Sequence, residues 1–219
     1  MDNPLVRAGN MGRTYGMGEH TVVALENATF EIPARSRIAL VGSSGSGKTT
    51  LLHLVAGLDS PTSGTIRWPA LGAKEHLRPR LVSMAFQGHS LISSLTIVEN
   101  VALPILIAGD RESEALKAAW EMLQRMSLTD VGYSLPGEIS GGQSQRAAIA
   151  RALVTHPTLL LTDEPTGQQD SEGSRNLMNF LLDFIQEFGT TLVVATHDRA
   201  VANLLPIQWS MEHGHLQTE

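Results

Sequence analysis

The chain has 219 residues, of which 42% are hydrophobic and 17% are charged, values that indicate a globular fold with an ample core. Its net charge of −6 argues against nucleic acid as the main partner, because a phosphate backbone requires a basic protein face. The absence of cysteine excludes disulfides and thiolate metal sites.

Residues 5–32 combine glycine-rich turns at 9–18 with two β-like runs, residues 22–25 and 28–32. This alternation is typical of an antiparallel flap of strands. Tyr15 is the one aromatic residue before the first run, and its position alone favours a role in packing.

The stretch GSSGSGKT at residues 42–49 matches the phosphate-binding loop, which has two glycines separated by four residues and followed by Lys and Thr. The apolar run at 38–41 before it is predicted to be a buried strand. The apolar residues after it recur at helical spacing: Leu51, Leu54, Val55 and Leu58. In such a unit the loop N–H groups converge on a phosphate, Lys48 adds positive charge, and Thr49 offers a hydroxyl to Mg²⁺. We therefore predict a nucleoside triphosphate site.

A turn at 59–64 follows the predicted helix, and short strands are predicted at 64–68 and 81–86. Gln87 comes directly after the second of these strands. Taken alone, a glutamine at a strand end is a solvated side chain and indicates no function.

Residues 90–141 form a predicted helical insert, in which 111–126 have apolar residues at helical spacing with charged residues between them. Polar residues and a proline interrupt the most apolar stretch, 91–109, and these are Ser93, Ser94, Glu99, Asn100 and Pro104. No unbroken apolar span of about 18 residues remains, so the chain is not expected to cross a membrane. The first residues also lack the basic and apolar regions of a signal peptide.

A second glycine-containing helix start lies at residues 139–146, with the sequence ISGGQSQR. Two glycines at a helix N-terminus expose unpaired N–H groups, which would suit a second anion site. An ordinary helix capped by a serine accounts for the same pattern equally well.

The predicted strand at 158–164 ends in two carboxylates. Because ligands of α/β sheets bind at the carboxyl ends of the strands, Asp163 is placed for Mg²⁺ and Glu164 for a water molecule. The alternative is a pair of solvated acids before Pro165, an interpretation that weakens once a phosphate loop belongs to the same sheet.

A helix is predicted for residues 171–188, with Gly189 ending it. Its inward-facing residues are expected to be Leu177, Phe180, Leu181, Phe184, Ile185 and Phe188. A buried strand at 190–196 follows, and His197 stands at its end.

The last apolar strand and turn occupy residues 207–216, where His213 and His215 alternate. Exposed edge positions explain these two histidines better than a metal site does. The predicted parallel strands are 38–41, 158–163 and 190–196, and the helices that alternate with them are 48–58, 143–155 and 171–188. This alternation predicts an α/β sheet with right-handed crossovers.

Together these motifs resemble the ATP-binding cassette of ABC transporters, over about residues 5–216. The most specific mark is SGGQ at 140–143, about 20 residues before the strand that ends in Asp163 and Glu164, in a chain that also has a phosphate loop. Within the family, three stretches resemble the branch that energises lipoprotein release, macrolide or peptide export and cell-division signalling in bacteria. They are residues 51–64, 99–104 and 164–167.

The resemblance implies an α/β fold, with a RecA-like P-loop NTPase core, an antiparallel β flap and a helical subdomain. It implies one ABC domain over residues 1–219, in which 1–90 and 142–219 form the core with its flap, and 91–141 form the helical subdomain.

The resemblance also assigns roles to individual residues. Catalytic roles fall to Glu164 as the base, His197 as the switch histidine, Lys48 and Gln87. Mg²⁺ ligands are expected from Thr49, Gln87 and Asp163. Nucleotide contacts are expected from Tyr15, Gly42, Ser43, Ser44, Gly45, Ser46, Gly47, Lys48, Thr49, Thr50, Ser140, Gly141, Gly142, Gln143 and Asp170. Tyr15 falls where the family places the aromatic ring that stacks on adenine, which replaces its interpretation as a packing residue.

The sequence departs from the family pattern at three positions. Thr162 interrupts the apolar run before Asp163, although a β-branched residue suits a strand. Gln169 stands before the Asp170 of the D-loop, where the family usually has leucine. Ile139 replaces the usual leucine before the signature motif, a change of similar volume.

The resemblance further implies ATP hydrolysis with Mg²⁺ in a head-to-tail dimer with a second cassette, expected to be a copy of the same chain. A transmembrane permease would contact Gln87 and residues 88–108 and hold the chain at the cytoplasmic face of the cell membrane. Two other hypotheses stay open. One is a soluble ABC ATPase acting on DNA ends or ribosomes, although the long coiled coil or second cassette of such proteins is missing here. The other is a non-hydrolysing regulatory cassette, although such cassettes usually lose the residue matching Glu164 or His197.

Overall fold

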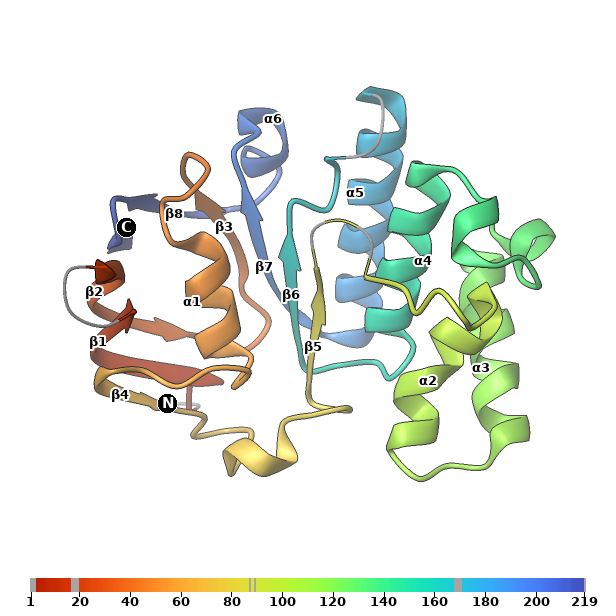
Figure 1. Cartoon of the computed structure of the whole chain (residues 1–219), viewed down its shortest axis with the longest axis horizontal. Helices are drawn as coiled ribbons and strands as arrows, with labels where there is room; N and C mark the ends of the chain where they lie inside the picture. The colour runs from red at the N-terminus through yellow and green to blue at the C-terminus, as the bar shows by residue number, and fades with distance from the viewer. Residues whose placement is uncertain (1–2, 17–19, 87, 89, 168–170, 219) are drawn as a thin grey trace. The chain divides into compact units, whose positions relative to one another are not determined.

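The computed structural model describes residues 3–16, 20–86, 88, 90–167 and 171–218 (Figure 1). The chain divides into two compact units, one made of Met1–Leu77 with Thr191–Glu219 and the other of Arg78–Thr190. Unit 1 contains the flap and the glycine loop at 42–49, and unit 2 contains the helical insert and the strand that ends in two acids.

Unit 1 is built mainly of strands. Its elements are β1 (Val6–Tyr15), β2 (Val22–Ile32), β3 (Arg37–Val41), α1 (Lys48–Val55), β4 (Ser63–Arg67), the 3₁₀ turn η2 (Lys74–His76), β7 (Thr191–Thr196), α6 (Arg199–Ala202), β8 (Ile207–Glu212) and β9 (His215–Thr218). β1 pairs antiparallel with β2 and with β4, which confirms the predicted antiparallel flap. β2 is one continuous strand where the sequence predicted two, and bulges in the pairing of β1 take up the irregularity.

β3 lies between β7 and β8 and is parallel to both. Its central residues are fully buried, as predicted, and these are Ile38, Ala39 and Leu40. β8 and β9 form an antiparallel hairpin. His213 lies in the turn of this hairpin with a φ of 47°, so the prediction that it alternates with His215 on one strand is wrong.

α1 follows the glycine loop and contacts β2 and β7. Leu51, Leu52 and Leu54 are at most 1% exposed, which confirms the predicted apolar face. The helix ends at Val55 rather than at residue 58, because the chain turns at Gly57, whose φ is +66°. Leu58 is therefore 45% exposed and does not continue the buried face.

Unit 2 consists mainly of helices. Its elements are β5 (Val82–Ala85), α2 (Ile97–Ile107), α3 (Glu112–Arg125), the 3₁₀ turns η3 (Thr129–Val131) and η4 (Pro136–Glu138), α4 (Gly141–Leu153), β6 (Leu159–Asp163) and α5 (Ser171–Phe188). β5 and β6 are parallel neighbours, and β6 is buried along its whole length. α2, α3 and α4 pack on one another (Figure 1), which confirms a helical segment between β5 and β6.

A capping box starts α2. The Thr96 N–H donates to the Glu99 carboxylate at 2.7 Å, and the Glu99 N–H donates to the Thr96 hydroxyl. Pro104, one of the residues that interrupt the apolar stretch, is accommodated inside α2. Within the described ranges, no helix has the length and apolar character that crossing a membrane requires.

α5 presents the predicted apolar face to the interior of unit 2, with Leu177, Leu181, Phe184 and Ile185 at most 3% exposed. Phe188 was expected inside as well, but it is 39% exposed. It lies at the end of the helix and packs against His156 and Phe184, with ring centroids 4.2 and 4.5 Å away. Gly189 has a φ of +68°, which confirms it as the residue that ends the helix.

Candidate functional site

The glycine loop at 42–49 leaves the carboxyl end of β3 and enters α1, the arrangement predicted for a phosphate loop. Lys48 is the first residue of α1 and is only 6% exposed. Its Nζ donates to the carbonyl oxygens of Gly42 and Ser43, at 2.8 and 2.9 Å. The ammonium group therefore lies inside the loop, bonded to its opening residues, where it can exchange these carbonyls for phosphate oxygens.

Two of the loop's glycines allow the backbone to approach its neighbours. A Cβ atom on Gly42 would lie 2.4 Å from the Met211 carbonyl oxygen on β8. Gly47 has a φ of +109°, and a Cβ there would lie 2.3 Å from the Ala24 carbonyl oxygen on β2. Because any side chain at either position would displace backbone, the loop keeps this shape only with glycine there.

The N-terminus of α1 has the character of an anion site. Gly47, at its N-cap, supplies no side-chain hydrogen bond, and the first turn contains no acidic residue. The first N–H groups of a helix have no intrahelical partner and carry partial positive charge. The Ser46 hydroxyl is buried, with no hydrogen-bond partner among the described residues. A nucleotide phosphate fits this donor set.

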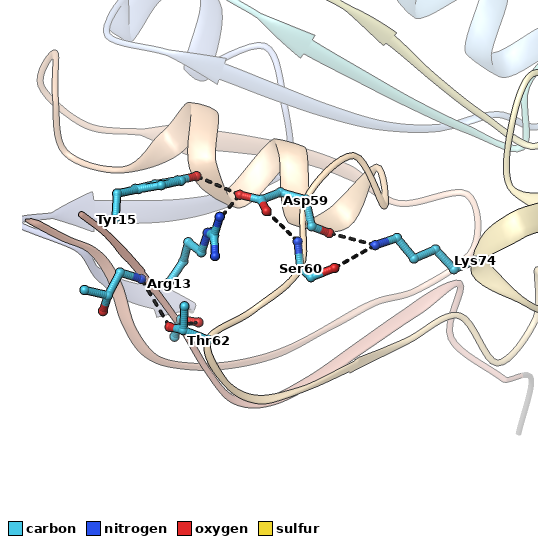
Figure 2. A network of polar contacts seen from close by, with 8 residues as sticks. Arg13, Tyr15, Asp59, Ser60, Thr62 and Lys74 are labelled. Atoms are coloured by element: carbon cyan, nitrogen blue, oxygen red, sulfur yellow. Dashed lines mark hydrogen bonds and ion pairs between the residues drawn. The ribbon is translucent and has the colours of Figure 1, made fainter. Parts of the chain in front are cut away.

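Tyr15 ends β1 and is 37% exposed, which is incompatible with a purely internal packing role. Figure 2 shows its hydroxyl pointing toward the turn that follows α1, where it donates to Asp59 Oδ2 at 2.8 Å. Arg13 donates to the same oxygen from Nε at 2.9 Å. The ring is thus held at the edge of unit 1 with part of its surface accessible.

His197 follows β7 and is exposed at the strand end, as predicted. The residues beside it are fixed by local hydrogen bonds. The Asp198 N–H donates to Thr196 Oγ1 at 3.0 Å, and Asp198 Oδ1 accepts from the Ala200 N–H at 2.8 Å, which starts α6. The backbone that carries His197 is therefore ordered by its own neighbours.

In unit 2, Asp163 ends β6 and Glu164 follows it directly, and the two residues are only 3% and 8% exposed. This burial is inconsistent with two solvated acids in a turn. Glu164 also adopts a φ of +47°, which L-residues rarely adopt. Such strain concentrates at functional sites, where the surrounding structure holds a side chain in a set direction.

Ser140 caps α4, and Gln143 completes a reciprocal capping box. The Ser140 N–H donates to Gln143 Oε1 at 2.9 Å, and the Gln143 N–H donates to Ser140 Oγ at 3.2 Å. This confirms the interpretation as a capped helix. The second interpretation, an anion site at Gly141 and Gly142, stays a prediction.

Two predicted site residues, Gln87 and Asp170, lie outside the described residues, as does Gln169, the departure from the family pattern. The predicted Mg²⁺ ligands Thr49 and Asp163 belong to different units. Their hydroxyl and carboxylate oxygens are the donors that Mg²⁺ prefers. Within the described part of either unit, no group of three His, Asp or Glu side chains is placed to hold a metal by itself.

Arg151 is a residue that sequence reasoning missed. Its guanidinium donates to the Ser90 carbonyl oxygen at 2.9 Å and to the Ser90 hydroxyl at 3.1 Å, which ties α4 to the segment after β5. Burial lowers the pKa of Arg151 from its usual value. The two residues are 61 positions apart, and no local pattern signals their contact.

Comparisons with known proteins all match this chain to members of one protein family. A family model described as ABC transporter matches residues 25–167. The lipoprotein-releasing system ATP-binding protein LolD of Hydrogenovibrio crunogenus is 38% identical, over 98% of this chain and 96% of its own length. LolD of Buchnera aphidicola is 32% identical, over 99% and 98%.

Two solved structures are similar over nearly the whole of this chain. A dimeric ATP-binding cassette in a post-hydrolysis state, bound to ADP and Pi, has a TM-score of 0.89 and 34% identity, with 97% of this chain and 98% of that chain covered. A component of an ABC transporter complex from Clostridium perfringens has a TM-score of 0.83 and 26% identity, with 99% and 88% covered.

Proposed function

The chain belongs to the ABC transporter family as an ATP-binding cassette, and from this premise we propose that its two units supply complementary parts of one ATPase cycle that drives lipoprotein or peptide export. It hydrolyses ATP to ADP and phosphate as the ATP-binding subunit of a transporter. The observation that carries the proposal is the buried Lys48 inside the glycine loop, with its ammonium held by two loop carbonyls.

Unit 1 binds the triphosphate. The loop N–H groups and the N-terminus of α1 surround the phosphates, while Lys48 neutralises the charge on the β- and γ-phosphates. The Tyr15 ring stacks on the adenine base, and His197 stabilises the γ-phosphate as charge shifts toward the leaving oxygen. Thr49 of unit 1 and Gln87 and Asp163 of unit 2 are the residues that would hold Mg²⁺, which would supply further neutralisation of phosphate charge.

Unit 2 supplies the group that acts on water. Glu164 is buried directly after β6, in a left-handed backbone conformation that L-residues rarely adopt and that is found most often at functional sites. It orients the attacking water and accepts its proton, since catalysis of phosphoryl transfer is mainly positioning and charge stabilisation.

A second cassette completes the site. The signature residues Ser140, Gly141, Gly142 and Gln143 start α4, and in the proposed head-to-tail dimer they cap the ATP bound to the other copy. The dimeric form of the solved cassette similar to this chain supports this assembly. ATP binding closes the dimer, and hydrolysis opens it again.

Lipoprotein release is the proposed transport activity, because two relatives that match over nearly the whole chain carry that name. We place the chain at the cytoplasmic face of the cell membrane, bound to a transmembrane permease through Gln87 and residues 88–108. Leu106 and Ile107 at the end of α2 support this contact, since they are 36% and 67% exposed.

The test is affinity purification of the full chain from detergent-solubilised membranes, followed by mass spectrometry. We expect a stoichiometric membrane partner with few spans and a large extracytoplasmic domain. A multi-spanning importer-like partner would contradict export. Recovery of only ribosomal or DNA-repair proteins would overturn the transport assignment.

A further inference from the structure

The turn after α1 and the end of β1 are joined by a network of polar side chains (Figure 2). Asp59 lies at its centre. Its Oδ2 accepts from the Tyr15 hydroxyl at 2.8 Å and from Arg13 Nε at 2.9 Å, and its Oδ1 accepts from the Ser60 N–H at 2.7 Å. The carboxylate therefore fixes two side chains of β1 at once.

Arg13 also contacts Tyr15 directly. Its guanidinium carbon lies 4.4 Å from the centroid of the Tyr15 ring, which is a cation–π arrangement. One face of the ring is thereby covered, and the hydroxyl is held by Asp59. The residue as a whole keeps 37% of its surface exposed.

The backbone on both sides of this contact is fixed. Lys74 Nζ donates to the Asp59 carbonyl oxygen at 3.1 Å and to the Ser60 hydroxyl at 2.9 Å. Thr62 makes three hydrogen bonds to β1. Its N–H and its hydroxyl both donate to the Gly12 carbonyl oxygen, at 2.9 and 3.2 Å, and its hydroxyl accepts from the Thr14 N–H at 3.2 Å. The turn cannot shift without breaking these bonds, so Asp59 is a rigid partner for Tyr15.

Asp59 stays ionised in this setting. Partial burial by itself would raise the pKa of the Asp59 carboxyl, but the Ser60 N–H, the Tyr15 hydroxyl and Arg13 outweigh it and lower that pKa below its usual value. An ionised carboxylate accepts all three hydrogen bonds near neutral pH.

We propose that Asp59 and Arg13 are positioning residues for nucleotide recognition, which hold the Tyr15 ring with one face against Arg13 and the other presented to the base of the bound nucleotide. The inference rests on the proposed stacking of Tyr15 on adenine. A ring already fixed in its bound orientation loses less conformational entropy when the base stacks on it. We expect the fixed orientation to strengthen ATP binding about threefold to tenfold.

The experiment measures binding of ATP and of inorganic tripolyphosphate, each with Mg²⁺, by isothermal titration calorimetry of the full chain. Tripolyphosphate has the phosphates but no base, so it reports the phosphate loop alone. Asp59→Ala and Tyr15→Phe are compared with the wild type. Tyr15→Phe removes only the hydroxyl that donates to Asp59 and keeps the ring, so it tests the contact without endangering the turn.

We expect both variants to bind ATP about threefold to tenfold more weakly, with tripolyphosphate affinity unchanged. A variant with both Asp59→Ala and Tyr15→Phe should bind ATP no more weakly than Asp59→Ala alone, because both changes remove the same hydrogen bond between Tyr15 and Asp59. The matched control is Glu31→Ala, which removes the carboxylate that accepts from another β1 arginine, Arg7, at 2.7 Å. It should leave ATP binding unchanged.

The outcomes separate this inference from the proposed function. If Tyr15→Ala weakens ATP binding while Asp59→Ala and Tyr15→Phe do not, stacking stands and the positioning role is refuted. If Tyr15→Ala leaves ATP binding unchanged, the stacking itself fails. Equal weakening of ATP and tripolyphosphate in Asp59→Ala would show a merely structural role and would overturn the inference.

Discussion

Lys48 is a cation buried at the base of the glycine loop, and burial of a charge requires compensating partners. The carbonyl oxygens of Gly42 and Ser43 provide them without any acidic side chain nearby in the first turn of α1. Carbonyl dipoles hold a cation less strongly than an anion does. A phosphate therefore competes successfully for the ammonium, which makes this residue a sensitive test of the loop's role.

Replacing Lys48 with alanine should remove ATP hydrolysis, with a loss of at least about 100-fold in turnover, because charge neutralisation at the transferred phosphate is lost. Assays of phosphate release and of nucleotide binding measure this loss. The control is Lys117→Ala, whose side chain is 79% exposed on α3 and should have no effect. Retained hydrolysis in Lys48→Ala would refute the assigned role.

At the scale of an element, the start of α2 depends on one buried amide. Asn100 is fully buried, and its Nδ2 donates to the carbonyl oxygens of Ile92, Leu95 and Thr96, each at 3.0 Å. Its Oδ1 accepts from the Ile92 N–H at 2.7 Å. One side chain thus satisfies backbone groups of the whole segment that precedes the helix, and it holds residues 92–96 in place.

Asn100→Ala should lower the free energy of unfolding by about 2–4 kcal/mol, because it leaves several backbone groups unpaired in the interior. Urea denaturation measures this loss. Asn176→Ala makes the same chemical change on the exposed side of α5 and should change stability by less than about 0.5 kcal/mol. If Asn100→Ala left the free energy of unfolding unchanged, water would have to replace the lost hydrogen bonds, which would contradict this prediction.

His156 packs against the aromatic rings at the end of α5, and it is the titratable group of this cluster. Burial, and then the charge of Arg125, lower the pKa of His156, while Glu187 opposes them. The Arg125 guanidinium carbon lies 5.3 Å from the centroid of the Phe184 ring, and the guanidinium forms an ion pair with Glu187. Neutral His156 is therefore the form that the folded state favours.

Because the folded pKa of His156 is below the unfolded value of about 6.5, the unfolded state binds more protons between those two values. The contribution of His156 to stability should be constant above about pH 6.5 and should decline as the pH falls below it. Thermal unfolding between about pH 5 and pH 8 measures the decline, which His156→Gln should reduce. An unchanged pH profile in that variant would exclude His156 as its source.

For the whole molecule, the proposed chemistry is divided between the two compact units. Lys48, His197 and Tyr15 belong to unit 1, whereas Ser140, Asp163 and Glu164 belong to unit 2. Among the described residues, neither unit contains all of the groups proposed for ATP hydrolysis. Turnover therefore depends on the chain as a whole, and in the proposed dimer on two copies of it.

Glu164→Gln should bind ATP without hydrolysing it, since glutamine cannot accept the proton of the attacking water. The variant should then accumulate as a dimer in the presence of ATP and Mg²⁺ and remain a monomer with ADP. Light scattering at matched protein concentrations distinguishes the two states. A monomer under both conditions would contradict the head-to-tail dimer.

Local pattern in the sequence was sufficient to predict most of the fold and the main motifs. The glycine loop, the strand that ends in Asp163 and Glu164, and the helix capped by Ser140 each depend on residues within a few positions of one another. Their backbone conformations follow from hydrogen bonding and side-chain periodicity over one or two turns. The same local rules failed at helix ends, where Leu58 and Phe188 are exposed although they continue an apolar repeat.

Only the tertiary structure revealed the contacts that join distant segments. Tyr15 and Asp59 are 44 positions apart, and Ser90 and Arg151 are 61 apart, yet each pair is within hydrogen-bond distance. Neither contact can be predicted from the sequence, because the spacing of polar residues along the chain does not indicate which distant residue each will contact. The meeting of two such groups depends on how the strands and helices between them pack, and that packing is a property of the folded chain.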